Sequence, residues 1–113
     1  HGRARTAEAT DWPRIVAFYD ALVALTGSPI VELNRVVAVS MAHGPAAALP
    51  LLDALADAPA LQRYHHLPSV RGDLLAKLGR HVEARTEFER AAALTDNAQE
   101  RALLLRRAGS SGS

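Results

Sequence analysis

Two glycines, Gly44 and Gly79, lie 35 residues apart, and each separates two stretches that have the periodicity of an amphipathic helix. Glycine readily adopts the left-handed backbone conformation that ends helices, so both positions predict turns between helices. Helix–turn–helix units that recur at about this distance cannot bury their apolar faces alone, and therefore they stack. The spacing predicts an all-α fold of stacked helical pairs, whose shared surface is suited to holding a partner.

The second helix of each unit carries an apolar triplet with the same internal spacing. The second residue of the triplet follows four positions after the first, and the third residue follows three positions after the second. The triplets are Ala84, Phe88 and Ala91; Ala48, Leu52 and Leu55; and Ile15, Tyr19 and Leu22. Any amphipathic helix shows this spacing, so the regular distance between triplets, 33 and then 36 residues, carries the argument. It indicates tetratricopeptide-type repeats. We expect a right-handed superhelix of about six antiparallel helices over residues 1–108, comprising about two and a half repeats and a capping helix.

Start and stop signals place the first three helices. Thr10 or Asp11 can cap the first helix, which Gly27 ends. Ser28 followed by Pro29 starts the second, and Gly44 with Pro45 starts a third that runs to about residue 57. Residues 36–39 read as a strand in isolation, but a helical apolar face over this stretch favours helix. The members of that expected face are Leu33, Val36, Val37, Ser40 and Met41.

The second half of the chain predicts three more helices. A fourth begins near Pro68 and ends at Leu78, and a fifth runs from the Gly79 turn to Leu94. Asp96 is the expected cap of the sixth, with Gln99 reaching back in a capping box. Residues 109–113, rich in Gly and Ser, predict a flexible tail or a cloning remnant. The chain starts at a histidine without a signal peptide, so we expect a fragment or a processed product.

The composition argues against several classes of function. Apolar residues make up 49% of the chain and aromatic residues 4%, which favours close packing of helix on helix. The 13 basic and 12 acidic side chains balance, so we expect no direct contact with nucleic acid or with a membrane. Cysteine is absent, which removes disulfides, thiolate catalysis and thiolate metal sites and fits a cytoplasmic location.

Three groups of short strings resemble one family in particular. The first is Thr10-Asp11-Trp12 with Ile15, Tyr19, Asp20 and Leu22; the second is residues 28–35, Ser-Pro-Ile-Val-Glu-Leu-Asn-Arg, running into residues 37–39 and Gly44-Pro45; the third is residues 73–75, 78–80, Glu83-Ala84, Leu94-Thr95, Asn97 and Glu100-Arg101. Together they resemble the tetratricopeptide-like C-terminal extension of bacterial extracytoplasmic-function RNA polymerase sigma factors, within the sigma-70 family. The resemblance covers Thr10 to about Arg107, and Pro68 departs from the family pattern.

This resemblance implies a function that composition and spacing do not show. It implies that the two sigma domains that bind DNA and polymerase precede the chain. The extension would be a non-catalytic domain that modulates transcription initiation. Its partners would be the sigma domains, RNA polymerase or a separate signalling protein. A free-standing adaptor that binds a peptide or helix in its concave groove is the alternative, and an upstream helix-turn-helix would separate the two.

Five histidines raise the question of a metal site: His1, His43, His65, His66 and His81. A helical metal pair needs two histidines four residues apart, whereas His65 and His66 are adjacent and diverge by about 100° on a helix. No set of side chains has the spacing of a catalytic constellation. We therefore expect no enzyme activity, no metal and no cofactor.

Candidate partner-binding residues lie on the helices expected to line the concave groove. Asn34 and Arg35 belong to the second helix, and His66, Asp73 and Lys77 to the fourth. Asn and basic residues in such grooves can clamp the terminal carboxylate of a peptide, but Asp73 has the wrong charge for that clamp. Asn34 and Arg35 can equally serve the fold, by capping carbonyls or by pairing with an aspartate.

Overall fold

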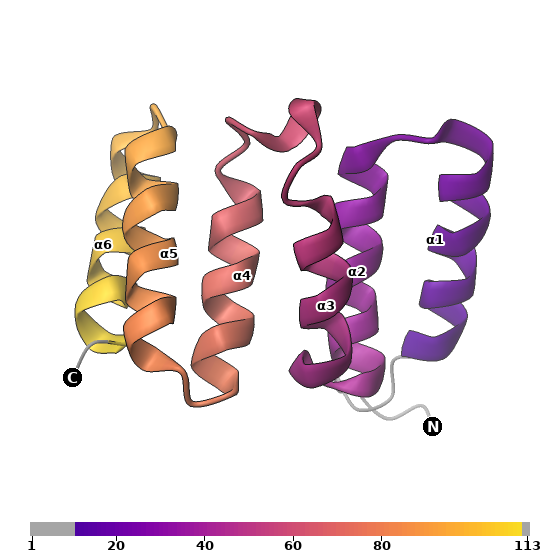
Figure 1. Cartoon of the computed structure of the whole chain (residues 1–113), viewed down its shortest axis with the longest axis horizontal. Coiled ribbons are helices and arrows are strands. Elements are labelled where there is room, and N and C mark those ends of the chain that lie inside the picture. The colour runs from indigo at the N-terminus through magenta and orange to yellow at the C-terminus, as the bar shows by residue number, and fades with distance from the viewer. Residues whose placement is uncertain (1–10, 112–113) are drawn as a thin grey trace, which may run out of the picture.

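The computed structural model describes residues 11–111, which fold into six α-helices and one short 3-10 helix with no strand (Figure 1). The elements are α1 (Trp12–Thr26), α2 (Pro29–His43), α3 (Pro45–Leu55), η2 (Pro59–Leu61), α4 (His66–Lys77), α5 (His81–Leu94) and α6 (Ala98–Ser111). The predicted all-α class is therefore confirmed. The alternative cap Thr10 and the histidine His1 lie outside the described residues.

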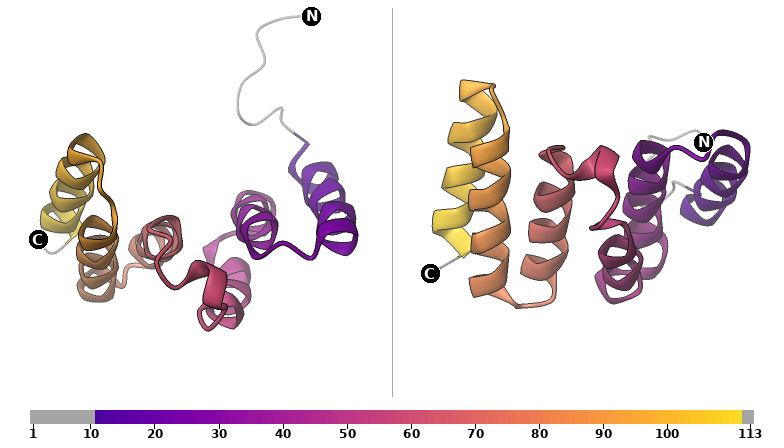
Figure 2. Two further views of the ribbon diagram at one scale, coloured as in Figure 1. Left: turned by 90° about the horizontal axis from the view of Figure 1, so that it is seen from above. Right: turned by 45° about the horizontal axis from the view of Figure 1, so that its top comes forward.

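The helices stand side by side in chain order, with α1 at one end of the row and α6 at the other (Figure 1). Each helix packs mainly against its neighbours in the sequence, and the α3–α4 junction is the least extensive of these contacts. Seen from above, α3 and α5 lie on one side of the row, while α2, α4 and α6 lie towards the other (Figure 2). From α2 to α6, alternate helices therefore share a side of the row (Figure 2).

The local signals for the helix ends act as expected. Asp11 caps α1, because its Oδ1 accepts a hydrogen bond from the Arg14 amide at 3.2 Å, and Ser28 caps α2 in the same way. Gly27 ends α1 with φ 62°, in the left-handed region that glycine adopts without strain. Gly44 and Gly79 also have positive φ, at 93° and 81°, so both are turns between helices as the 35-residue spacing predicted.

Residues 36–39 are helical, but the predicted inner face of α2 is partly wrong. Leu33, Val36 and Ser40 are buried as expected. Val37 and Met41, in contrast, keep 39% and 46% of their surface exposed. The packed side of α2 is set by α1 and α3, and these two residues lie outside the arc that those helices cover.

The start of α4 is at His66, which places Pro68 in the first turn of the helix. The missing amide of proline costs nothing there, since the first-turn amides have no partner within the helix. Pro68 is also among the most deeply buried side chains of the protein. This residue therefore fits a helix start, although it departs from the family pattern.

The cap of α6 is one residue later than predicted. Asn97, not Asp96, accepts the hydrogen bond from the Glu100 amide at 2.9 Å, and Glu100 in turn accepts one from the Thr95 hydroxyl. This register buries Leu104 on α5, whereas the leucines on either side of it remain exposed. The helix continues through residues 109–111, which were expected to belong to a flexible tail.

The core follows the triplets except at the end of the row. The triplets on α3 and α5 are buried, and Phe88 has no exposed surface. The triplet on α1 is only half-buried, and this helix has no fully buried residue. Since α1 packs mainly against α2, much of its surface remains uncovered, with Phe18 62% and Leu25 83% exposed.

Candidate functional site

An uncovered stripe runs along α2 on the side away from its packed face. It consists of Ile30, Asn34, Val37 and Met41, which follow one another at the three- and four-residue steps of one helix face. Three of these residues are large and apolar, and each keeps between 39% and 46% of its surface exposed. Large apolar side chains that gather on one face mark sites of interaction more often than single ones do.

A cavity of about 330 Å³ lies beside this stripe, between α2, α4 and α6. We call it the groove. Its lining residues are Val37, Ser40 and Met41 from α2; Ser69, Val70, Asp73, Leu74 and Lys77 from α4; and Arg107 from α6. All of these lining residues belong to α2, α4 and α6, the three helices that lie towards one side of the row (Figure 2). It thus combines an apolar wall with a small set of charged groups.

The charged groups of the groove form one connected cluster. The Asp73 carboxylate accepts a hydrogen bond from Arg107 Nη2 at 2.8 Å and pairs with Lys77 Nζ at 2.9 Å. Arg107 also lies over the Phe88 ring, with Cζ 4.4 Å from the ring centroid, in a cation–π contact. Two cations therefore surround one carboxylate, and the cluster is net positive.

A smaller cavity of about 100 Å³ continues the groove between α4 and α6 and shares Ser69 and Arg107 with it. Here Glu100 accepts a hydrogen bond from the Thr95 hydroxyl at 3.1 Å, and its other oxygen lies 3.2 Å from His65 Nε2. The Thr95 hydroxyl first, and then His65, hold the pKa of Glu100 below the ordinary value of a glutamate. His65 stacks on His66, so this cluster ties the start of α4 to the start of α6.

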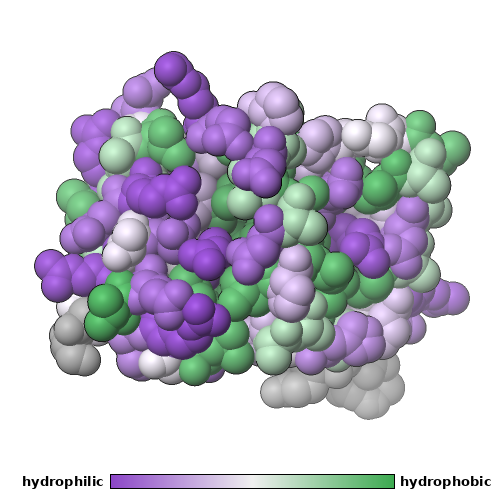
Figure 3. All heavy atoms as spheres, viewed as in Figure 1, coloured by the Kyte–Doolittle hydropathy of each residue, from purple (hydrophilic) through white to green (hydrophobic). Residues whose placement is uncertain are grey.

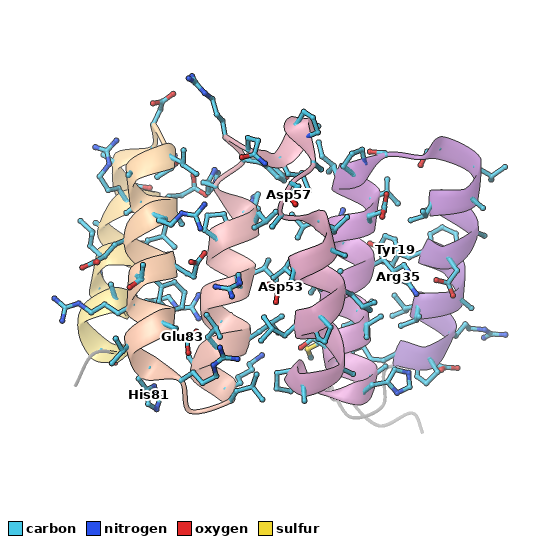
Figure 4. All side chains as sticks on the ribbon, in the orientation of Figure 1. Tyr19, Arg35, Asp53, Asp57, His81 and Glu83 are labelled. Atoms are coloured by element: carbon cyan, nitrogen blue, oxygen red, sulfur yellow. The ribbon has the colours of Figure 1, made fainter. Side chains whose placement is uncertain are left out.

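The predicted partner-binding residues divide into two sets. Asp73 and Lys77 line the groove, and His66 lines its smaller continuation. Asn34 is exposed on the α2 stripe, one turn before Val37. Arg35 is not part of this site, because it turns towards α1 and pairs with Asp20, which matches the structural alternative (Figure 4).

Sequence reasoning missed Arg107 as a member of the site, although the repeat period contains the signal. Arg107 and Asp73 are 34 residues apart, and His65 and Glu100 are 35 apart. Both separations are close to the spacing of the two turn glycines, so each pair joins similar positions of successive units. Residues one period apart on alternate helices are therefore candidates for contact.

The opposite side of the row holds a second cavity, of about 310 Å³, between α3, η2, α4 and α5. Asp53 and Asp57 of α3 and its following turn line it (Figure 4). Both of its arginines are already engaged: Arg71 pairs with Asp53 at 2.9 Å and with the buried Glu87 at 3.3 Å, and Arg90 pairs with Glu87 at 3.0 Å. On this side hydrophilic residues predominate over α5 and α6 (Figure 3). The engaged charges serve to join α3, α4 and α5.

Two further observations concern the described range as a whole. No three histidine, cysteine, aspartate or glutamate side chains within residues 11–111 are placed to share a metal ion. No helix of that range has both the length and the apolar character that crossing a membrane requires.

Fold and groove together define a helical, repeat-like protein. The chain is similar to an uncharacterized protein of Rhizobium meliloti (strain 1021), with 48% identity over 104 residues. The matched stretch is 92% of this chain and 24% of the relative, so the chain spans about a quarter of the length of the relative it matches. No family model matches the chain, and no solved structure matches it.

Proposed function

We propose that the chain is a non-catalytic regulatory domain that binds a protein segment in the groove between α2, α4 and α6. The observation that carries this proposal is the uncovered apolar stripe of α2 facing that groove. Val37 and Met41 line the groove, and together with Ile30 they remain exposed. Five other residues of the same helix are buried: Leu33, Val36, Ala38, Val39 and Ser40. An apolar surface beside a few convergent polar groups is the usual anatomy of a binding site.

The fold that we propose is the tetratricopeptide-like right-handed superhelix. The row of antiparallel neighbours, the glycine turns 35 residues apart and the alternation of helices between two sides support it. In such a fold the helices α2, α4 and α6 line the concave surface, which is where extended or helical segments bind.

The setting that we propose is a bacterial extracytoplasmic-function sigma factor acting in the cytoplasm. The strings that resemble the C-terminal extension of that family support this, with Ser28, Pro29, Asn34 and Arg35 among them. A relative about four times as long as the matched stretch also favours a domain within a larger protein over a free-standing adaptor. The partner is then a sigma domain, RNA polymerase or a signalling protein, and nucleic acid is not contacted by this domain.

Co-purification of the parent protein, with and without this domain, against core RNA polymerase and cell lysate tests the proposal. We expect deletion to change both the bound partners and the transcription that the parent protein directs. The paired variants Val37→Ser and Val82→Ser refine the test, since Val82 is 78% exposed on α5 and does not line the groove. Only Val37→Ser should reproduce the deletion. Unchanged partners and unchanged transcription after deletion would contradict a regulatory role.

A further inference from the structure

Lys77 and Arg107, the cations of the groove, have more N–H donors than their contacts to Asp73 use. A guanidinium offers five N–H donors and an ammonium three. Within the described residues, Arg107 and Lys77 each form one ion pair, and in both cases the partner is Asp73. Both cations are partly exposed, Arg107 at 40% and Lys77 at 49% of the side chain, so a ligand can reach them.

Arg107 is also held in place before any ligand arrives. Its guanidinium lies 4.4 Å above the Phe88 ring, and Phe88 is fully buried between the helices. Its bond to Asp73 fixes the group from a second direction. A cation that is already fixed loses less conformational entropy on binding an anion than a free one does.

The apolar wall lies directly beside these cations. Val37 and Met41 of α2 and Val70 and Leu74 of α4 line the same cavity as Lys77 and Arg107. A volume of about 330 Å³ accommodates one or two side chains of a bound segment, but not a folded domain. A ligand that fills the wall with an apolar group therefore places its next polar group at the cations.

We infer that the groove binds a protein segment that carries a carboxylate beside a large aliphatic side chain. The carboxylate bridges Lys77 and Arg107, and the aliphatic side chain lies against Val37, Met41 and Val70. Asp73 by itself has the wrong charge to hold a carboxylate, but Lys77 and Arg107 outnumber it, so the cluster is net positive. Charge complementarity therefore favours an acidic segment, because this cluster repels a basic one and leaves a neutral one without charge-assisted hydrogen bonds. The inference rests on the proposed function and specifies the chemistry of the partner.

Three synthetic peptides of equal length test the inference, each acetylated and amidated so that no terminal charge contributes. They differ at two adjacent central positions, which carry Leu-Glu, Leu-Gln or Ala-Glu in a Gly/Ser background. Each is titrated into the methyl-labelled 113-residue chain and followed by NMR. We expect the Leu-Glu peptide to shift the methyl signals of Val37, Met41 and Val70. It should bind about fivefold more tightly than either of the others, and added salt should reduce its advantage over Leu-Gln.

Matched variants test the cations and the apolar wall of the groove separately. Lys77→Gln should weaken the Leu-Glu peptide about fivefold and leave Leu-Gln unaffected. Arg85→Gln should change neither, because Arg85 pairs with Glu89 on an exposed face of α5. Val37→Ser should weaken both leucine peptides, whereas Val82→Ser should not. Circular dichroism checks that each variant keeps its helical content.

Each contrary result overturns a defined part of the inference. Equal affinity for Leu-Glu and Leu-Gln would show that the site does not recognise the carboxylate. Signal shifts confined to residues of α3 and α5 would show that the peptide does not bind in the groove. Absence of binding by all three peptides at millimolar concentration overturns the inference entirely. The co-purification experiment does not depend on these peptides, so the proposed function can fail or succeed separately.

Discussion

Gly72 of α4 lies close against the Phe88 ring of α5, and Gly72→Ala tests how tightly this contact is packed. A Cβ at this position would lie 2.8 Å from Phe88 Cε1, 2.9 Å from Cδ1 and 3.1 Å from Cζ. Contacts under 3.0 Å require something to shift. The Phe88 ring has little room to do so, since it is fully buried and Arg107 lies over it.

Two opposing effects set the size of the change. Alanine is favoured over glycine in a helix interior by about 1 kcal/mol. Overpacking a filled core costs about 1–3 kcal/mol. The steric term is the larger, so we expect Gly72→Ala to destabilise the protein by about 1 kcal/mol. For a domain of this size that corresponds to a fall in melting temperature of about 4–8 °C.

Urea unfolding followed by circular dichroism measures this change, with Gly109→Ala as the control. Gly109 is helical in α6, but a Cβ there would meet no atom within 4 Å, so alanine should be neutral or stabilising. The double variant Gly72→Ala/Phe88→Leu should recover about 1–2 kcal/mol relative to the sum of the single changes. If Gly72→Ala raises the unfolding midpoint as Gly109→Ala does, the steric argument is refuted.

Three other substitutions have definite expected outcomes. Asn97→Ala should lower stability by about 1 kcal/mol in urea unfolding through the loss of the α6 cap, whereas Asp96→Ala should be close to neutral; equal losses would restore Asp96 as the cap. The lowered pKa of Glu100 means that its contribution is complete above the pKa of an unfolded glutamate, about 4.3, and is lost as the pH falls through the lower folded value. The melting-temperature difference between wild type and Glu100→Gln should therefore shrink below about pH 4, and a constant difference would contradict this account. Glu87→Gln should cost about 1 kcal/mol in the same unfolding assay, because two arginines lose their buried anion; an unchanged midpoint would show that these ion pairs contribute nothing.

Local chemistry made the helix ends of this protein predictable. Asp11, Ser28, Gly27 and the turn glycines act within one turn of their own position, so a short window of sequence contains the whole signal. Asp96 failed as a cap because Asn97 next to it is as good a cap. Residue type alone therefore does not choose between Asp96 and Asn97, and the structure shows that Asn97 accepts the capping bond.

The groove was only partly predictable, because contacts between helices decide which residues line it. The sequence indicated which helices would line it, and Asp73 and Lys77 of α4 do lie there. The exposure of Val37 and Met41 depends on how far α1 and α3 wrap around α2, which a hydrophobic pattern does not encode. Arg35 has the same local pattern as a groove residue, but the position of Asp20 on the neighbouring helix directs it elsewhere.

The junction between α3 and α4 has a mechanical consequence. It carries the least extensive contact between neighbouring helices, so we expect the row to bend there more readily than within either group of three helices. On one side the Arg71–Asp53 bond crosses this seam, and on the other side α2 faces α4 and α6 across the groove. A segment bound in the groove would touch both halves at once. The curvature and stiffness of the whole row would then depend on whether the groove is occupied. A small ligand could in this way change the distance between α1 at one end of the row and α6 at the other.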